Sequence, residues 1–204
     1  MNDYLRAYPD QVAVLLAVEL CSLTIQREDH SIANLVATSL FGDGAAAVVA
    51  VGANRAPAGP GRPRVLASRS RLYPDTTDMM GWQIGSDGFR IVLSADVPTV
   101  ADKYLGEDVR LFLAEFWLTT TDIATWVCHP GGPKVIEAVE SVLDLPDDAL
   151  DRTRKSLWEN GNLSSVSVLD VLSANLAAPP AEGELGMMIA MGPGFCSELV
   201  LLGW

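Results

Sequence analysis

Two polar residues, His129 and Asn162, are predicted to stand at the ends of regular elements, where they could act on one carbonyl group. His129 follows the apolar run 123–128 and precedes residues 130–133, Pro-Gly-Gly-Pro, with which a helical pattern begins. Asn162 follows Gly161, just past one predicted helix and at the start of another. An imidazole and a carboxamide can both donate hydrogen bonds to the same oxygen, which stabilises an enolate or an oxyanion. The pair indicates acyl chemistry, but the sequence shows no equally clear nucleophile.

Each of these residues also has a structural interpretation that needs no ligand. A histidine at a strand end is most often a satisfied polar residue, and an asparagine beside a helix-terminating glycine is often a cap. The functional interpretation is favoured for His129 because ligands gather at the carboxyl ends of strands in α/β sheets. Gly131 and Gly132 would then let the backbone approach a substrate closely.

Apolar runs and the breaks between them predict the elements that would position this pair. Residues 12–18 and 45–51 are continuously apolar, which is typical of strands covered on both faces. The other predicted strands are 65–70, 90–94, 123–128, 187–191 and 198–202. The last two are joined by a turn at Gly192-Pro193-Gly194. The predicted helices are 98–118, 133–143, 147–160 and 164–176. Strands alternating with helices predict a layered α/β fold. Residues 53–64, rich in proline and glycine, predict a linker.

Composition narrows the class of protein. The chain has 204 residues, 49% of them hydrophobic, and a formal net charge of −12, which argues against nucleic acid or an anionic membrane surface as the main partner. Three cysteines and two histidines are too few for a disulfide framework or a histidine-rich metal centre, so no metal is expected. The apolar run 12–18 is too short to span a bilayer, and no basic segment marks a signal peptide. We therefore expect a reduced, cytoplasmic protein.

Four motifs in order make the sequence recognisable. They are Leu40-Phe-Gly-Asp-Gly-Ala-Ala-Ala47, His129-Pro-Gly-Gly-Pro133, Gly161-Asn-Leu-Ser-Ser165 and Gly192-Pro-Gly194. Together they resemble the type III polyketide synthases, the chalcone and stilbene synthase family of the thiolase fold, over nearly the whole chain. Residues 19–22, Glu-Leu-Cys-Ser, look like the bacterial branch. Condensing enzymes of fatty-acid synthesis share the histidine and asparagine, but the Gly-Gly-Pro and Leu-Ser-Ser contexts make that alternative less favoured.

The resemblance implies a thiolase-like layered fold, with residues 1–52 ending an N-terminal half, 53–64 as the linker and 65–204 as the C-terminal half. It also implies a Cys-His-Asn triad that condenses malonyl-coenzyme A units onto an acyl-coenzyme A starter, in a homodimer. Coenzyme A thioesters would be substrates, and no further cofactor is expected. His129 and Asn162 match the histidine and asparagine, which polarise the malonyl thioester for decarboxylation.

Other positions match the walls of the family's reaction cavity. Phe41 matches one gatekeeper phenylalanine, whereas Ile91 stands where the other is usual, which implies a differently shaped opening. Thr24, Trp82 and Ser164 match residues that tune chain length and cyclisation. Gly131 and Gly132 follow the matched histidine and belong to the same substrate-binding set. Pro193 matches a loop that shapes the cyclisation pocket.

The nucleophile is the member of the triad that the sequence does not supply. In the family the cysteine begins a buried helix whose dipole lowers the thiol pKa. Residues 2–8 resemble the last turns of that helix, so the cysteine is expected before Met1, and Cys21, Cys128 and Cys196 are not substitutes. We expect part of a synthase, inactive in synthesis by itself, that self-associates or pairs with the missing portion because its apolar strands lack cover. The alternative is a non-catalytic thiolase-fold module that binds acyl-coenzyme A or dimerises with a full-length synthase.

Overall fold

A four-stranded sheet forms the centre of the computed structural model, which describes residues 1–55, 61–86 and 88–204. The strands run in the order β3 (Arg64–Leu72), β8 (Cys196–Gly203), β7 (Leu185–Gly192) and β6 (Ile123–Cys128). Strand β8 is antiparallel to both β3 and β7, whereas β6 and β7 are parallel. The carboxyl ends of β6 and β7 therefore meet at one edge of the sheet.

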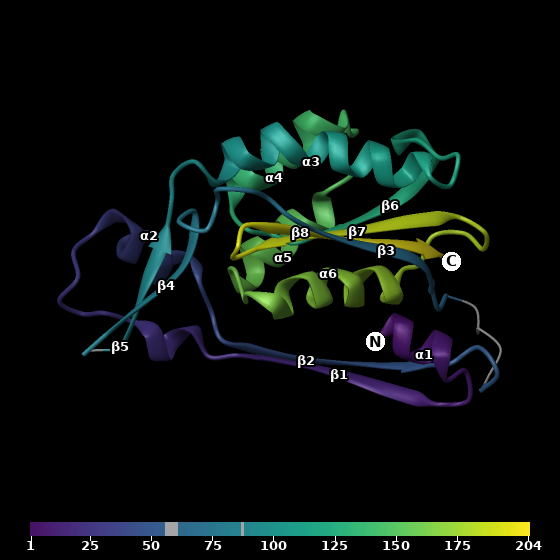
Figure 1. Ribbon diagram of the computed structural model, residues 1–204, viewed down its shortest axis with the longest axis horizontal. Helices are drawn as coiled ribbons and strands as arrows, with labels where there is room; N and C mark the ends of the chain where they lie inside the picture. Colours follow the sequence, from purple (N-terminus) through teal and green to yellow (C-terminus); the bar gives the residue numbers. More distant parts are fainter. Residues whose placement is uncertain (56–60, 87) are drawn as a thin grey trace.

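Helices and a two-stranded ribbon build further layers on this sheet (Figure 1). Helices α3 (Val97–Ala114) and α4 (Pro133–Leu143) cover one face, and α6 (Ser165–Ala177) lies against the other with α5 (Asp151–Asn160) beside it. On the far side of α6 lies an antiparallel ribbon of β1 (Val12–Glu19) and β2 (Gly44–Val51). The layered α/β fold predicted from the sequence is confirmed.

The remaining elements are short. They comprise α1 (Asn2–Ala7), the 3-10 helices η1 (Cys21–Thr24) and η2 (Thr120–Asp122), α2 (Ile32–Leu40), and the antiparallel hairpin of β4 (Met80–Gly85) and β5 (Gly88–Leu93). Helix α2 and η1 contact β5, so they and the hairpin form one end of the molecule (Figure 1). In the part of the chain that the structure describes, no helix is long and apolar enough to cross a membrane.

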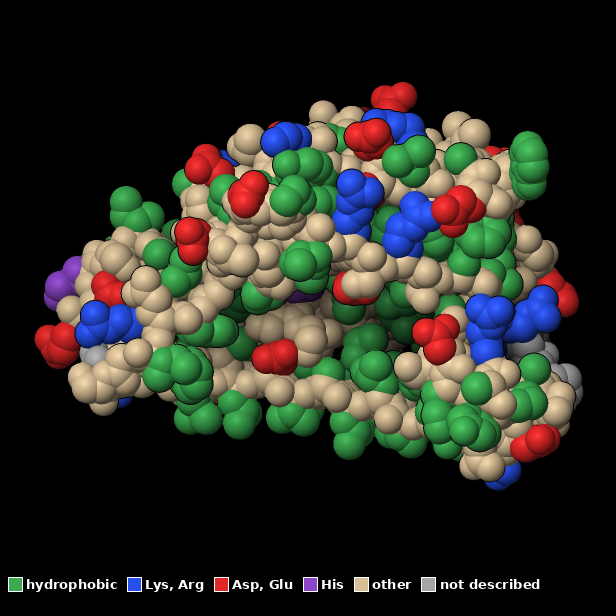
Figure 2. All heavy atoms as spheres, in the orientation of Figure 1, with side chains coloured by type: hydrophobic (Ala, Val, Ile, Leu, Met, Phe, Trp, Pro, Cys, Tyr) green, Lys and Arg blue, Asp and Glu red, His purple; other side chains and the backbone are tan. Residues whose placement is uncertain are grey.

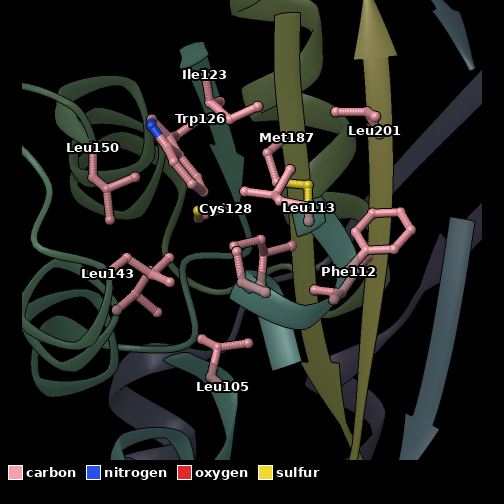
Figure 3. Packing of buried hydrophobic residues seen from close by; sticks show 14 of the residues in the cluster. Leu105, Phe112, Leu113, Ile123, Trp126, Cys128, Leu143, Leu150, Met187 and Leu201 are labelled. Atoms are coloured by element: carbon pink, nitrogen blue, oxygen red, sulfur yellow. The ribbon is translucent and has the colours of Figure 1, made fainter. Parts of the chain in front are cut away.

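The main hydrophobic core lies between α3, α4 and the sheet (Figure 3). Leu105, Val109 and Phe112 recur at helical spacing on α3 and are almost fully buried. They pack in one cluster with Met187 and Ile189, which point to the same side of β7 because side chains alternate along a strand. Burying each such side chain contributes about 1.5–3 kcal/mol. This core holds β6 and β7, whose ends carry the site.

Some predicted boundaries differ from the structure. The helix predicted over 98–118 ends at Ala114, because Trp117 adopts a left-handed φ of 60° in the turn that follows. The helix predicted over 147–160 begins at Asp151. Helix α2 and strand β4 have no counterpart among the elements predicted from the sequence. The predicted linker 53–64 includes residues 56–60, which lie outside the described residues, so that domain boundary stays a prediction.

The two apolar runs near the start do form strands, but in the described chain they are not covered on both faces. The exposed fractions are 58% for Val14, 73% for Leu16 and 66% for Val18 on β1, and 67% for Val49 on β2. Figure 2 shows hydrophobic side chains along the lower rim, where the ribbon lies. Strands of this composition are expected to expose such a patch wherever the elements that would cover them are absent.

Candidate active site

The backbone of Asn162 is held against the motif at residues 40–44. Helix α5 ends at Asn160, and Gly161 takes a φ of 72°, a left-handed conformation suited to glycine. The N–H of Asn162 donates to the carbonyl of Leu40 at 2.7 Å, and the N–H of Gly42 donates to the carbonyl of Asn162 at 3.0 Å. A Cβ at Gly161 would lie 2.6 Å from the Leu40 oxygen, so only glycine permits this approach.

The side-chain amide of Asn162 is bonded at both ends and only 3% of the residue is exposed. Its Oδ1 accepts a hydrogen bond from the N–H of Ser164 at 2.9 Å, and its Nδ2 donates to the carbonyl oxygen of Gly131 at 3.2 Å. An N–H donor on one side and a carbonyl acceptor on the other decide which end of the amide is the nitrogen. Nδ2 therefore faces the loop that follows His129. Neither Asn162 nor His129 is among the residues that line the cavity described below.

His129 begins that loop at the carboxyl end of β6. Its N–H donates to the carbonyl of Ile189 on β7 at 2.8 Å, and its own carbonyl accepts from the N–H of Gly131 at 2.9 Å. Burial lowers the pKa of the imidazole to about 4, because a charged ring loses hydration there. At neutral pH the imidazole is therefore uncharged and carries one N–H donor. Gly131 therefore bonds both to the backbone carbonyl of His129 and to the side chain of Asn162, which places Asn162 against the loop that His129 begins.

A cavity of about 340 Å³ lies beside the Asn162 segment. Its walls include five of the eight substrate-binding positions inferred from the resemblance: Thr24, Phe41, Trp82, Ile91 and Ser164. Phe41 forms a bridge with Asn162, and the N–H of Ser164 bonds to the Asn162 side chain, so the cavity adjoins the asparagine. Trp82 and Ile91 are directly paired across the β4–β5 hairpin.

Two carboxylates anchor segments of this cavity wall. Asp43 accepts hydrogen bonds from the N–H and the hydroxyl of Ser22, at 2.7 and 2.6 Å, and these bonds lower the pKa of the Asp43 carboxyl. This contact ties η1, which carries Thr24, to the motif at 40–44. Glu19 accepts from the N–H and hydroxyl of Ser165 at the start of α6, at 3.3 and 2.5 Å. It thereby holds the segment that carries Ser164, whose φ of 51° is strained for a residue other than glycine.

Gly131, Gly132 and Pro193 do not line that cavity, but they lie at the same sheet edge as His129. A Cβ added at Gly131 or Gly132 would come no closer than 3.4 Å to any neighbouring atom outside the adjacent residues. Packing within the chain therefore does not demand glycine at either position. Pro193 lies in the turn that follows β7, the strand whose Ile189 carbonyl accepts the N–H of His129.

The three cysteines occupy different surroundings, and all are free thiols. Cys128 is buried at the end of β6, where burial raises the thiol pKa well above its usual range. Burial also raises the thiol pKa of Cys196 at the start of β8. Cys21 opens the four-residue helix η1, and its Sγ lies 3.5 Å from the hydroxyl oxygen of Ser164 in the cavity wall. Cys128 and Cys196 are therefore poor sources of a thiolate.

Sequence reasoning missed part of the cavity wall. Asn34 and Thr38 line it from α2, a helix absent from the sequence prediction. The signal was available, because Ser31 accepts a hydrogen bond from the N–H of Asn34 and so provides the N-cap that commonly starts a helix. Among the described residues, no group of three His, Cys, Asp or Glu side chains could hold a metal ion.

Comparison with known proteins identifies the family of the chain. The family described as "Chalcone and stilbene synthases, C-terminal domain" matches residues 64–203. The chain is 56% identical to a 1,3,6,8-tetrahydroxynaphthalene synthase of Streptomyces peucetius subsp. caesius, with 100% of this chain and 54% of that protein covered. It is 38% identical to a putative chalcone synthase of Bacillus subtilis, over 99% of this chain and 56% of that protein.

A solved structure shows the same arrangement of elements. The crystal structure of 1,3,6,8-tetrahydroxynaphthalene synthase from Streptomyces coelicolor A3(2), a bacterial type III polyketide synthase, matches with a TM-score of 0.91 and 30% identity, over 99% of this chain and 57% of that one. The chain thus spans about half the length of the curated relatives it matches.

Proposed function

The chain belongs to the chalcone and stilbene synthase family, and from this premise we propose that it forms the C-terminal part of a type III polyketide synthase. The complete protein would condense malonyl-coenzyme A units onto an acyl-coenzyme A starter. The observation that carries this proposal is the amide of Asn162, which is bonded at both ends and donates to Gly131, in the loop that follows His129.

His129 and Asn162 would act as two neutral donors to the thioester carbonyl of the malonyl group. As the bond from the methylene carbon to the carboxylate breaks, its electron pair forms the enolate and carbon dioxide leaves. The enolate carbon then attacks the acyl thioester, and the thiolate leaves. Burial keeps His129 uncharged at neutral pH by lowering its pKa, and a neutral imidazole can polarise a carbonyl by hydrogen bonding.

The cavity beside Asn162 would hold the growing acyl chain. It combines the aromatic rings of Phe41 and Trp82 with the hydroxyls of Thr24 and Ser164, a lining of apolar walls with a few polar groups that is usual for a small-molecule site. Ile91 would leave a wider opening than a phenylalanine because its side chain is smaller.

Two glycines and a turn would complete the substrate path. The space in front of Gly131 and Gly132, which a Cβ could occupy without a severe clash, supports a role in admitting the thioester. Pro193 would shape the part of the pocket where the chain cyclises, since its turn lies at the same sheet edge as His129.

The nucleophile would be a cysteine outside this chain. The raised thiol pKa of Cys128 and of Cys196 supports this, since the thiolate is the reactive form. The relatives are almost twice as long as the chain, which leaves room for such a segment. The free state of all three cysteines also supports the cytoplasmic location expected from the sequence.

The exposed face of the β1–β2 ribbon would be covered by the rest of the synthase. Apolar side chains on that face, such as Leu16 at 73% exposure, form a row rather than isolated points. Sedimentation of the 204-residue chain over a concentration series is expected to show self-association. Leu16→Lys should weaken it, and Leu111→Lys on α3 is the control. A stable monomer at high concentration would contradict this assignment.

Malonyl-coenzyme A decarboxylation by the complete protein tests the function. Wild-type protein should release acetyl-coenzyme A and carbon dioxide, and Asn162→Ala should abolish most of this activity while Asn160→Ala retains it. Tight binding of acyl-coenzyme A without any carbon dioxide release would instead support the non-catalytic binding module.

A further inference from the structure

The backbone N–H and carbonyl of Phe195 are both hydrogen-bonded to a buried turn that follows β3. The N–H of Tyr73 donates to the carbonyl of Phe195 at 2.9 Å, and the N–H of Phe195 donates to the hydroxyl oxygen of Thr76 at 2.8 Å. The Thr76 hydroxyl in turn donates to the carbonyl of Tyr73 at 2.8 Å. Phe195 immediately precedes β8 and follows the turn at residues 192–194. These residues are almost fully buried, so water cannot easily replace a lost bond.

The Tyr73 phenol anchors this turn to two other elements. Its hydroxyl donates to Asp108 Oδ2 on α3 at 2.7 Å, and the hydroxyl oxygen of Ser197 on β8 lies 2.9 Å from the phenol oxygen. Arg71 lies 3.3 Å from Asp108 Oδ1 and compensates the charge of that carboxylate. Burial and the bond to Asp108 raise the pKa of the Tyr73 phenol, which keeps it protonated as a donor.

The apolar cluster around Phe195 connects three segments that carry proposed site residues. Met191 packs there just before the 192–194 turn, and Val135 packs there from the first turn of α4, after Gly132. Met80 and Leu93, a paired couple at the base of the hairpin that carries Trp82 and Ile91, join the same cluster. A shift of Phe195 would therefore displace side chains in several segments that carry proposed site residues.

We propose that Thr76 and Tyr73 are positioning residues, which hold the 192–194 turn in place through the backbone of Phe195 and so set how the product chain is folded before release. This inference rests on the proposed function. Both side chains are buried, and their hydroxyls are bonded within the chain, so both act through the turn and not by touching the substrate.

Thr76→Val is the direct test, because it keeps the shape of the side chain and removes the acceptor of the Phe195 N–H. In the complete protein, hydrogen exchange of residues 192–197 should become at least about tenfold faster, which corresponds to about 1.4 kcal/mol. The ratio of cyclised to prematurely released products should also change while malonyl-coenzyme A decarboxylation stays near the wild-type rate. Thr76→Ser keeps the hydroxyl and should restore both readouts.

Thr121→Val is the matched control, since Thr121 is exposed and its hydroxyl bonds to that of Thr119, far from the turn at 192–194 in the sequence. Wild-type exchange in Thr76→Val, or faster exchange with an unchanged product ratio, would overturn the proposal. If Thr76→Val does not fold, Tyr73→Phe replaces it and should also speed exchange, because only the hydroxyl is lost. A wild-type protein that makes no polyketide would refute the proposed function, whereas the exchange comparison would still test the positioning role.

Discussion

Replacing Asn162 by alanine removes two hydrogen bonds at once, and its cost can be worked out from the structure. The N–H of Ser164 loses its acceptor and the carbonyl of Gly131 loses its donor. A buried group left without a partner costs about 1–3 kcal/mol. Because Ser164 and Gly131 are only partly buried, water can compensate in part, and the lower end of that range applies to each. We expect the free energy of unfolding to fall by about 2 kcal/mol.

The same substitution removes one donor to the substrate carbonyl. Loss of a single oxyanion-hole donor typically lowers kcat by about 10²–10³-fold, so malonyl-coenzyme A decarboxylation by the complete protein should fall by about that factor. Urea unfolding and steady-state release of acetyl-coenzyme A measure the two effects. Asn160→Ala is the control, because Asn160 is exposed and its side chain makes one bond, of 3.1 Å, to Asp170. Equal stability and equal rates in the two variants would refute the reasoning.

Asn162→Asp tests the hydrogen bond at each end of the amide independently. It keeps an acceptor for the N–H of Ser164 but places a second oxygen against the carbonyl of Gly131. The carboxylate form should be destabilised by repulsion, whereas the protonated acid can donate to Gly131 as the amide does. Stability relative to wild type should therefore improve as pH falls through the pKa of the new carboxyl, and a pH-independent difference would argue against the assigned amide orientation.

Three further outcomes are expected. An unfolded histidine takes up a proton near pH 6.5, whereas burial lowers the pKa of His129 to about 4. Acid should therefore lower the free energy of unfolding between these pH values by at most about 3 kcal/mol. His129→Gln should lose this pH dependence and His30→Gln should keep it, so identical pH profiles for the two variants would contradict the prediction. Ser164→Gly should raise the free energy of unfolding by about 1 kcal/mol in urea, since glycine tolerates the φ of 51°, and a loss of stability would count against strain there. Incubation of the 204-residue chain with acyl-coenzyme A should give no stoichiometric adduct by intact mass, and an adduct on any cysteine would place the nucleophile inside the chain.

Much of the architecture was predictable because it is written in local patterns. The strand predicted at 123–128 coincides with β6, and the helix predicted from Pro133 coincides with α4. Continuous apolar runs and helical stripes report which faces of an element are buried, and that information is local. Helix α2 was missed although Ser31 offered an N-cap signal, whereas strand β4 was missed because its pattern is weak. Strand β4 is largely exposed, and its backbone bonds are supplied by β5.

The sequence by itself determined the residue types of the site: a histidine after a strand, an asparagine after a helix, and glycines around both. That the two side chains share one ligand stays a prediction. Only the tertiary structure decided that the nitrogen of the Asn162 amide points at Gly131. It also decided that residues as far apart in the chain as Thr24 and Ser164 line a single cavity. The reason is physical: hydrogen bonds and cavity walls join segments far apart in the chain, and their geometry follows from how the layers pack.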